Sequence, residues 1–135
     1  MRLDHVQLAA PPGCEQQARA FYGDLLGLSE IVKPAQLRAR GGVWFALDGG
    51  QQLHVGVEPR FAPARKAHPA LAVEPQALDV LADRLTQAGA RPQWDDAIGA
   101  VRRFYVADPW GNRLELLAEA TRPDPAAATR PRRCG

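Results

Sequence analysis

The sequence predicts an α+β fold built from two consecutive βαβββ modules. Three observations predict it. Short segments alternate apolar and polar residues as strands do, two segments carry the apolar spacing of a helix, and the order strand, helix, three strands occurs twice. A chain of 135 residues fits one compact domain. We place that domain at residues 1–120, with the modules at about 1–57 and 67–118.

The first module begins with an expected strand at residues 3–9, in which Val6 and Leu8 alternate with His5 and Gln7. A helix at 15–26 follows, because its apolar side chains recur every three or four residues. The other strands are expected at 30–33, 42–47 and 52–57, and Asp48-Gly49-Gly50 forms the turn between the last two.

The second module repeats this order after a linker that contains Pro59 and Pro63. Its first strand is expected at 68–73, and its helix begins at Pro75 and ends before Gly89. The other strands are expected at 91–95, 102–107 and 112–118, with a turn at Asp108-Pro109-Trp110-Gly111. Residues 121–135 show no periodicity, so we expect a flexible tail there.

Composition argues against several classes of protein. The net charge of +2 is too small to indicate nucleic-acid binding, and no apolar run approaches the roughly 20 residues of a membrane span. The N-terminus lacks the apolar stretch of a signal peptide. Cys14 and Cys134 lack the CxxC spacing of a zinc site and are expected to be free thiols. We therefore expect a cytoplasmic protein without nucleic-acid or membrane partners.

All three histidines lie at the edges of the two modules. His5 and His54 lie near the two ends of the first module, and His68 and Glu115 lie at similar places in the second. In each strand these residues face away from the neighbouring leucines and valines, so they can point into one volume. Because neutral imidazole and carboxylate bind divalent transition metals, the pattern predicts a metal site formed by these four residues.

Four motifs in this chain match motifs of a known superfamily. They are Asp4-His5-Val6, Phe21-Tyr22-x-x-Leu25-Leu26-Gly27-Leu28, Ala67-His68 and Asp108-Pro109-Trp110-Gly111-Asn112-Arg113-Leu114-Glu115. With them, residues 1 to about 118 resemble the vicinal oxygen chelate superfamily, also called glyoxalase/bleomycin-resistance/dioxygenase. The resemblance implies that two curved sheets form a cup around the metal. It also implies a homodimer in which His5 and His54 of one subunit share a metal with His68 and Glu115 of the other.

The first function that the resemblance implies is a glyoxalase-like lyase or isomerase. One divalent metal (Zn, Ni, Fe, Co or Mn) would bind two oxygens of a small substrate and act as a Lewis acid. Bacterial glyoxalase I carries glutamate or glutamine at the position of His54, and a basic residue at the position of Ala9. These departures argue against glutathione as the cosubstrate.

Two other functions stay open. In an extradiol-type dioxygenase, His5, His68 and Glu115 would hold Fe(II), with His54 as acid or base and Tyr105 nearby. A drug-binding protein of the bleomycin-resistance type would need no metal. The residues expected to take part in catalysis are Glu115, His54 and Tyr105, and those expected to bind the substrate are Arg65, Lys66, Trp44 and Phe104.

Overall fold

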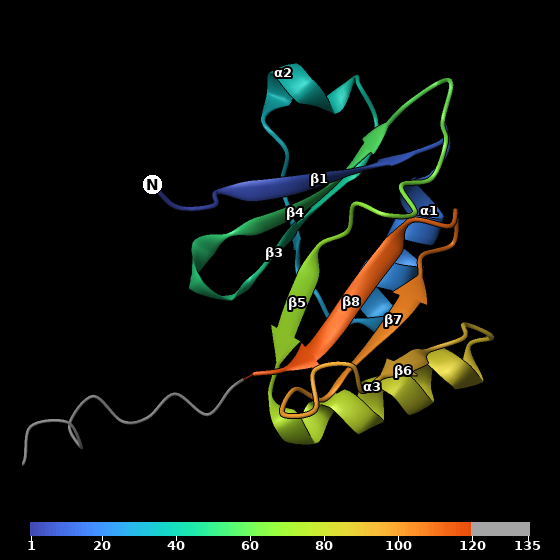
Figure 1. The fold of residues 1–135 in the computed structure, drawn as a ribbon. Helices are drawn as coiled ribbons and strands as arrows, with labels where there is room; N and C mark the ends of the chain where they lie inside the picture. The colour runs from blue at the N-terminus through green and yellow to red at the C-terminus, as the bar shows by residue number, and fades with distance from the viewer. Residues whose placement is uncertain (120–135) are drawn as a thin grey trace, which may run out of the picture.

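The computed structural model describes residues 1–119, which form two modules of the expected kind (Figure 1). The first module contains β1 (His5–Ala10), α1 (Glu15–Ala18), η1 (Arg19–Leu25), β2 (Glu30–Ile31), α2 (Ala35–Arg38), β3 (Val43–Ala46), η2 (Asp48–Gly50) and β4 (Gln52–Val57). The second contains β5 (Ala70–Val73), α3 (Pro75–Gln87), β6 (Gln93–Asp95), β7 (Arg103–Ala107) and β8 (Arg113–Ala118). The predicted α+β class and the repeated module are confirmed.

Each module forms one mixed four-stranded sheet, and the two sheets have the same topology. The strand orders are β1-β4-β3-β2 and β5-β8-β7-β6. In each sheet the first strand of the module pairs in parallel with the last, and the other pairs are antiparallel. This register places Gln7 opposite His54 in one sheet and Ala70 opposite Glu115 in the other.

One face of each sheet packs into the hydrophobic core. Alternate residues of the strands, such as Phe45 and Leu53 in the first sheet and Phe104 and Leu114 in the second, are fully buried. In α3 the predicted apolar stripe is buried, and this helix packs on β8. Burial of one such side chain stabilises a fold by roughly 1.5–3 kcal/mol. The opposite face of each sheet therefore carries the polar residues.

Two local features differ from the sequence prediction. The helix expected at 15–26 is a short α-helix that continues as a π-helix, with a backbone bond from Leu26 N to Phe21 O. This wider turn places Phe21 and Tyr22, which are adjacent in sequence, together in the core. The short helix α2 was not predicted. This helix follows Pro34 and carries no buried residue. Its sequence therefore lacks the apolar stripe that would predict a helix.

Buried polar side chains join the two modules. The Tyr22 hydroxyl donates a 2.8 Å hydrogen bond to Asp108, which also accepts bonds from the backbone and side-chain amide of Asn112. The Asn112 side chain donates to the carbonyl of Ala9 in β1 and accepts from the backbone of Ala64 in the linker. The turn between β7 and β8 is thereby tied to the first module and to the linker.

The expected tail at 121–135 and Cys134 lie outside the described residues. Cys14 is a buried free thiol. Across residues 1–119, no helix combines the length and the apolar character needed to cross a membrane.

Candidate metal centre

His68 and Glu115 form the first half of the candidate centre. His68 lies just before β5 and Glu115 lies on β8, and the two strands pair in parallel. The His68 Nε2 atom is 3.1 Å from Glu115 Oε2, and the side chains are 23% and 10% exposed. His68 Nδ1 lies 2.9 Å from the carbonyl oxygen of Lys66. A neutral ring that donates from Nδ1 to this carbonyl turns the Nε2 lone pair toward the carboxylate.

In that tautomer both His68 Nε2 and the Glu115 carboxylate are acceptors, so a cation or a proton must lie between them. Ligand atoms at about 2.1 Å from one ion are roughly 3.0 Å apart at neighbouring octahedral positions and roughly 3.4 Å apart at tetrahedral ones. The separation of 3.1 Å between His68 Nε2 and Glu115 Oε2 lies within that range. This half of the candidate centre therefore fits a divalent cation.

Arg103 on β7 fixes the other oxygen of Glu115. Its guanidinium lies 3.0 Å from Glu115 Oε1 and 3.2 Å from Asp95 on β6, and the Arg103 side chain is 14% exposed. Desolvation opposes the charged form, but the bonds to Asp95 and Glu115 outweigh it, so the pKa of Arg103 is raised. Glu115 therefore has one oxygen on Arg103 and one on His68, which fixes the direction of its carboxylate.

Tyr105 lies directly across from Glu115 in the β7–β8 pair. Its ring meets the ring of His68 edge to face, with the centroids 5.4 Å apart. The guanidinium of Arg113 stacks over the Tyr105 ring at 3.8 Å. The predicted catalytic residues Tyr105 and Glu115 therefore lie together with His68 on one face of the second sheet.

His5, His54 and Trp44 form the second half of the candidate centre as a stack of three rings. Trp44 and His54 are stacked 3.8 Å apart with an interplanar angle of 1°, and His5 lies 4.4 Å beyond His54 at 17°. His54 Nε2 contacts Gln52 Oε1 at 2.8 Å. A ring that donates from this nitrogen keeps its lone pair on Nδ1. His5 Nδ1 contacts Asp4 at 2.8 Å, which leaves Nε2 for a ligand.

The stacked rings of His5 and His54 are poorly placed to bind the same ion at the same time. An imidazole lone pair lies in the plane of its ring, so two nearly parallel rings do not point at a common ion between them. His5 can use its free Nε2 atom, whereas His54 would have to turn away from Trp44. His54 is only 4% exposed, and burial, followed by the charge of His5, lowers its pKa.

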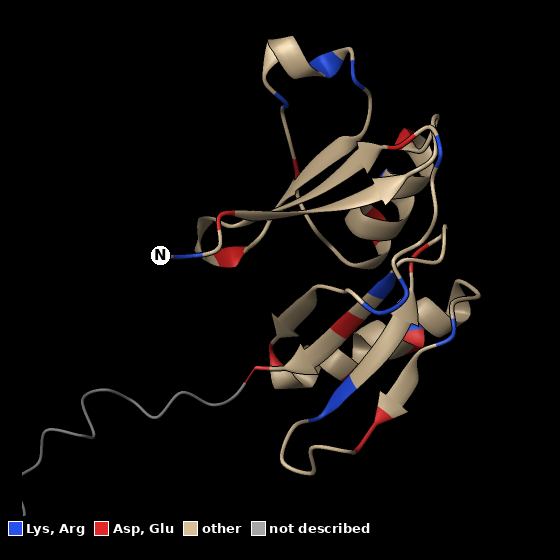
Figure 2. Cartoon of the chain, turned by 45° about the horizontal axis from the view of Figure 1, so that its top comes forward, with Lys and Arg blue, Asp and Glu red and all other residues tan. Residues whose placement is uncertain are grey.

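The described chain does not bring the two halves of the candidate centre together. Among residues 1–119, no three side chains of histidine, cysteine, aspartate or glutamate gather as a metal cluster. The four predicted ligands instead form two pairs, one on each sheet. The two sheets also differ in their charged residues. Glu30 on β2 is the charged residue of the first sheet, whereas β6, β7 and β8 of the second carry Asp95, Arg103, Arg113 and Glu115 (Figure 2).

The predicted substrate-binding residues lie in different places. Trp44 is part of the ring stack, and Arg65 and Lys66 are exposed next to His68. Phe104 does not line the polar face of its sheet. Its side chain is 0% exposed in the core, because it alternates with Tyr105 on β7 and so faces the opposite way.

Three polar residues at the centre were not singled out for these roles from the sequence. Arg103 holds Glu115, Arg113 stacks on Tyr105, and Gln52 contacts His54. Gln52 and Arg113 lie two residues from His54 and Glu115 along the same strands. Strand alternation therefore places them on the ligand face and could have identified them. The pairing of Arg103 with Glu115 depends on the register between β7 and β8. This register cannot be read from a single sequence.

Comparison with known proteins places this fold and site in a family. The model of the glyoxalase-like domain matches residues 14–117, and the chain belongs to this family, within the vicinal oxygen chelate superfamily. A search of curated proteins found no match.

Solved structures agree with this assignment. A glyoxalase family protein from Bacillus anthracis is 48% identical, covering 89% of this chain and 96% of that one, with a TM-score of 0.82. A glyoxalase/dioxygenase from Nostoc punctiforme is 23% identical over 88% and 91% of the two chains, with a TM-score of 0.73. A lactoylglutathione lyase from Agrobacterium tumefaciens is 21% identical over 87% and 92%, with a TM-score of 0.65. The last two show the fold alone.

Proposed function

We propose that this protein is a metal-dependent, glyoxalase-like lyase or isomerase that acts on a small substrate with two neighbouring oxygen atoms. The observation that carries the proposal is the His68–Glu115 pair. His68 Nε2 and Glu115 Oε2 lie 3.1 Å apart, and the Lys66 carbonyl and Arg103 orient the two side chains. Such an oriented histidine–carboxylate pair is typical of divalent metal sites.

The second half of the site would come from another copy of the chain. His5 and His54 lie on the other sheet, and one chain does not join the two pairs into a cluster within its described part. A symmetric dimer can bring the first sheet of each subunit to the second sheet of its partner and would form two equivalent sites. We therefore propose a homodimer whose sites are shared between subunits.

The chain's own residues would divide the chemistry between them. A bound divalent metal would polarise the two substrate oxygens as a Lewis acid. His54, with its free Nδ1 and its ring fixed by Trp44 and Gln52, would move a proton next to these oxygens. Arg65 and Lys66 would bind an anionic group of the substrate, and Trp44 would form an apolar wall.

A second candidate function is an extradiol-type dioxygenase, and the geometry of His54 favours it. The Nε2 atom of His54 contacts Gln52 and its ring stacks on Trp44, so His54 would act as acid or base beside the metal. His5, His68 and Glu115 would then form a two-histidine, one-carboxylate set. In this function Tyr105 would lie at the substrate, near His68. Oxygen consumption with catechols in the Fe(II)-loaded protein supports this candidate. Turnover of diketones or thiol adducts without oxygen consumption supports the first.

Metal analysis of variants tests the shared basis of both functions. The purified protein would be loaded in turn with Zn, Ni, Fe, Co and Mn, and bound metal would be measured after gel filtration. We expect His68→Ala and Glu115→Gln to lower metal affinity by at least about tenfold, because each removes a ligand. Glu119→Gln, an exposed carboxylate next to β8, is the matched control and should bind metal normally. Unchanged binding in both ligand variants would refute the site, and a metal-free wild type would favour drug binding.

A further inference from the structure

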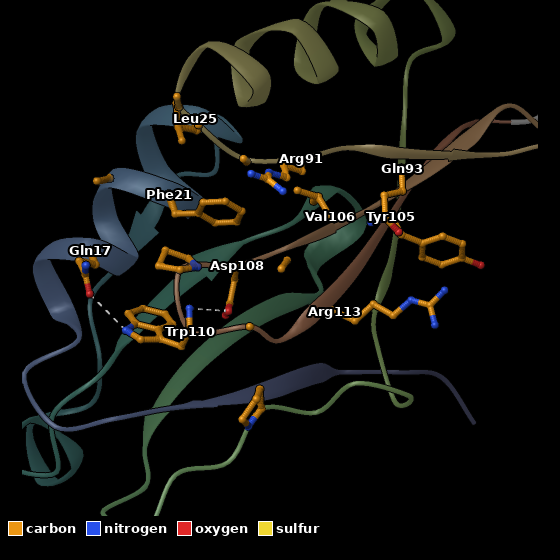
Figure 3. Close-up of a pocket in the computed structure, with 18 of the residues that line it drawn as sticks. Gln17, Phe21, Leu25, Arg91, Gln93, Tyr105, Val106, Asp108, Trp110 and Arg113 are labelled. Atoms are coloured by element: carbon orange, nitrogen blue, oxygen red, sulfur yellow. Dashed lines mark hydrogen bonds between the residues drawn. The ribbon is translucent and has the colours of Figure 1, made fainter.

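A cleft lies between the first helical segment and the turn that joins β7 to β8 (Figure 3). Its volume is about 920 Å³, within the range of roughly 300–1,000 Å³ that is usual for small-molecule sites. His68 and Glu115 do not line it, whereas Gln17 and Phe21 of the helical segment do. The cleft therefore excludes the candidate metal ligands themselves, although Tyr105 and Arg113 from the candidate centre form one end of it.

One side of the cleft is apolar and held in place. Phe21, Leu25 and Trp110 contribute their side chains to this wall. The indole nitrogen of Trp110 donates a 3.2 Å hydrogen bond to Gln17, which fixes the ring across the cleft from Phe21 (Figure 3). Flat apolar surfaces of this kind bind the body of an aromatic or aliphatic ligand.

Most charged residues that line the cleft are arginines. Arg91, Arg113 and Arg65 all line the cleft, and none forms an ion pair within residues 1–119. In Figure 3 the guanidinium of Arg91 points into the cleft beside Phe21, while Arg113 lies toward Tyr105. Guanidinium groups without carboxylate partners are free to bind an external anion.

The acidic residue of the cleft does not cancel this charge. Asp108 is 5% exposed, and it accepts hydrogen bonds from Tyr22, Asn112 and the backbone of Trp110. These donors hold its carboxylate in the buried network that joins the modules. A ligand against the apolar wall therefore meets Arg91, while Arg113 and Arg65 line other parts of the cleft.

We propose that this cleft binds a small organic anion with a flat apolar body. Arg91 binds the anionic group, Arg113 and Arg65 add positive potential, and the apolar body lies against Phe21 and Trp110. The proposal needs no metal. The cleft shares Arg65 with the function proposed above, so variants of the metal ligands are needed to distinguish the two sites.

A pair of fluorescent probes tests charge recognition. Both 1-anilinonaphthalene-8-sulfonate and its uncharged analogue N-phenyl-1-naphthylamine carry the same aromatic body, and only the first is an anion. We expect Arg91→Gln to weaken binding of the sulfonate about three- to tenfold and to leave the neutral probe unchanged, because one charge-assisted contact is lost at a partly solvated site. Arg40→Gln, an exposed arginine outside the cleft, is the matched control. Added salt should reduce the difference between the probes.

Two further variants locate the binding. Ala20 is exposed and lines the cleft, so Ala20→Trp should fill it and abolish binding of both probes without disturbing the core. His68→Ala and Glu115→Gln should bind the sulfonate as the wild type does. The proposal is overturned if Arg91→Gln behaves like Arg40→Gln, if Ala20→Trp binds both probes normally, or if binding depends on His68 and Glu115.

Discussion

The hydroxyl of Tyr22 donates a buried 2.8 Å hydrogen bond to the carboxylate of Asp108, 86 residues further along the chain. Tyr22 lies on η1 in the first module, and Asp108 begins the turn between β7 and β8 in the second. Both residues belong to motifs that indicated the family, and the structure gives them a physical role. They connect the modules, and the same turn orients β8, which carries Glu115.

Replacement of Tyr22 by phenylalanine should destabilise the fold without changing its shape. The variant keeps the ring in the core but removes the donor to Asp108, which costs about 1–2 kcal/mol because Asp108 keeps its other donors. Urea denaturation would measure the loss. Tyr105→Phe is the control, since that hydroxyl forms no hydrogen bond among the described residues, and it should change stability by less than about 0.5 kcal/mol.

The stability of the protein should fall steeply at alkaline pH because of Tyr22. Burial raises the pKa of Tyr22 well above 10, and the charge of Asp108 and their hydrogen bond raise it further. A folded-state pKa above the unfolded value gives stability that is complete below pH 10 and is lost as the pH rises past it. One proton bound only in the folded state makes the free energy of unfolding fall by about 1.4 kcal/mol per pH unit. Tyr22→Phe should lack this contribution to the pH dependence of stability.

Absorbance at 295 nm separates the two tyrosines in that experiment. In Tyr105→Phe, Tyr22 is the remaining tyrosine of the chain. The absorbance of its tyrosinate form should rise only as the protein unfolds, and circular dichroism would monitor that unfolding. A signal that rises in the folded protein near pH 10 would contradict the prediction.

Alanine should be much less tolerated at Gly42 than at Gly56. Gly42 has a φ of +80°, and a Cβ atom there would overlap the backbone carbonyl of Val55 in β4. At Gly56 the Cβ would meet only the flexible end of the Gln7 side chain, at 2.7 Å from Nε2. We expect Gly42→Ala to cost more than about 2 kcal/mol and Gly56→Ala less than about 1 kcal/mol, as thermal unfolding would show.

Mixing two inactive variants would test whether sites are shared between subunits. His5→Ala/His54→Ala and His68→Ala/Glu115→Gln should each bind no metal. After subunit exchange, metal should return to about one quarter of the wild-type amount, because about half of the dimers are mixed and each mixed dimer rebuilds one of two sites. If the purified mixed dimer binds no metal, the sites are not built in this way.

Much of the fold was predictable because its signals are local. The strand and helix positions follow from apolar periodicity, and the helix stripe ending at Leu85 is buried as predicted. The repeat of the two modules was also visible in the sequence. The π-helical continuation after Ala18 was not, because it depends on how Phe21 and Tyr22 pack against the two sheets rather than on the spacing of apolar residues.

The candidate site was less predictable than the fold. The sequence indicated which residues could bind a metal, but the stacking of His5, His54 and Trp44 depends on the parallel register of β1 and β4. The wrong placement of Phe104 had a different cause. Tyr105 and Phe104 are adjacent on one strand, so they could not both face the site, and alternation alone excluded one of them.

The position of β8 in its sheet has a consequence for synthesis of the protein. β8 lies between β5 and β7, although it is the last of these strands along the chain. A nascent polypeptide that has reached residue 112 therefore has the flanking strands of the second sheet without the strand that joins them. The second half of the protein can complete its sheet only after residue 118 has left the ribosome, and until then β5 and β7 expose unpaired edges to chaperones and to other chains.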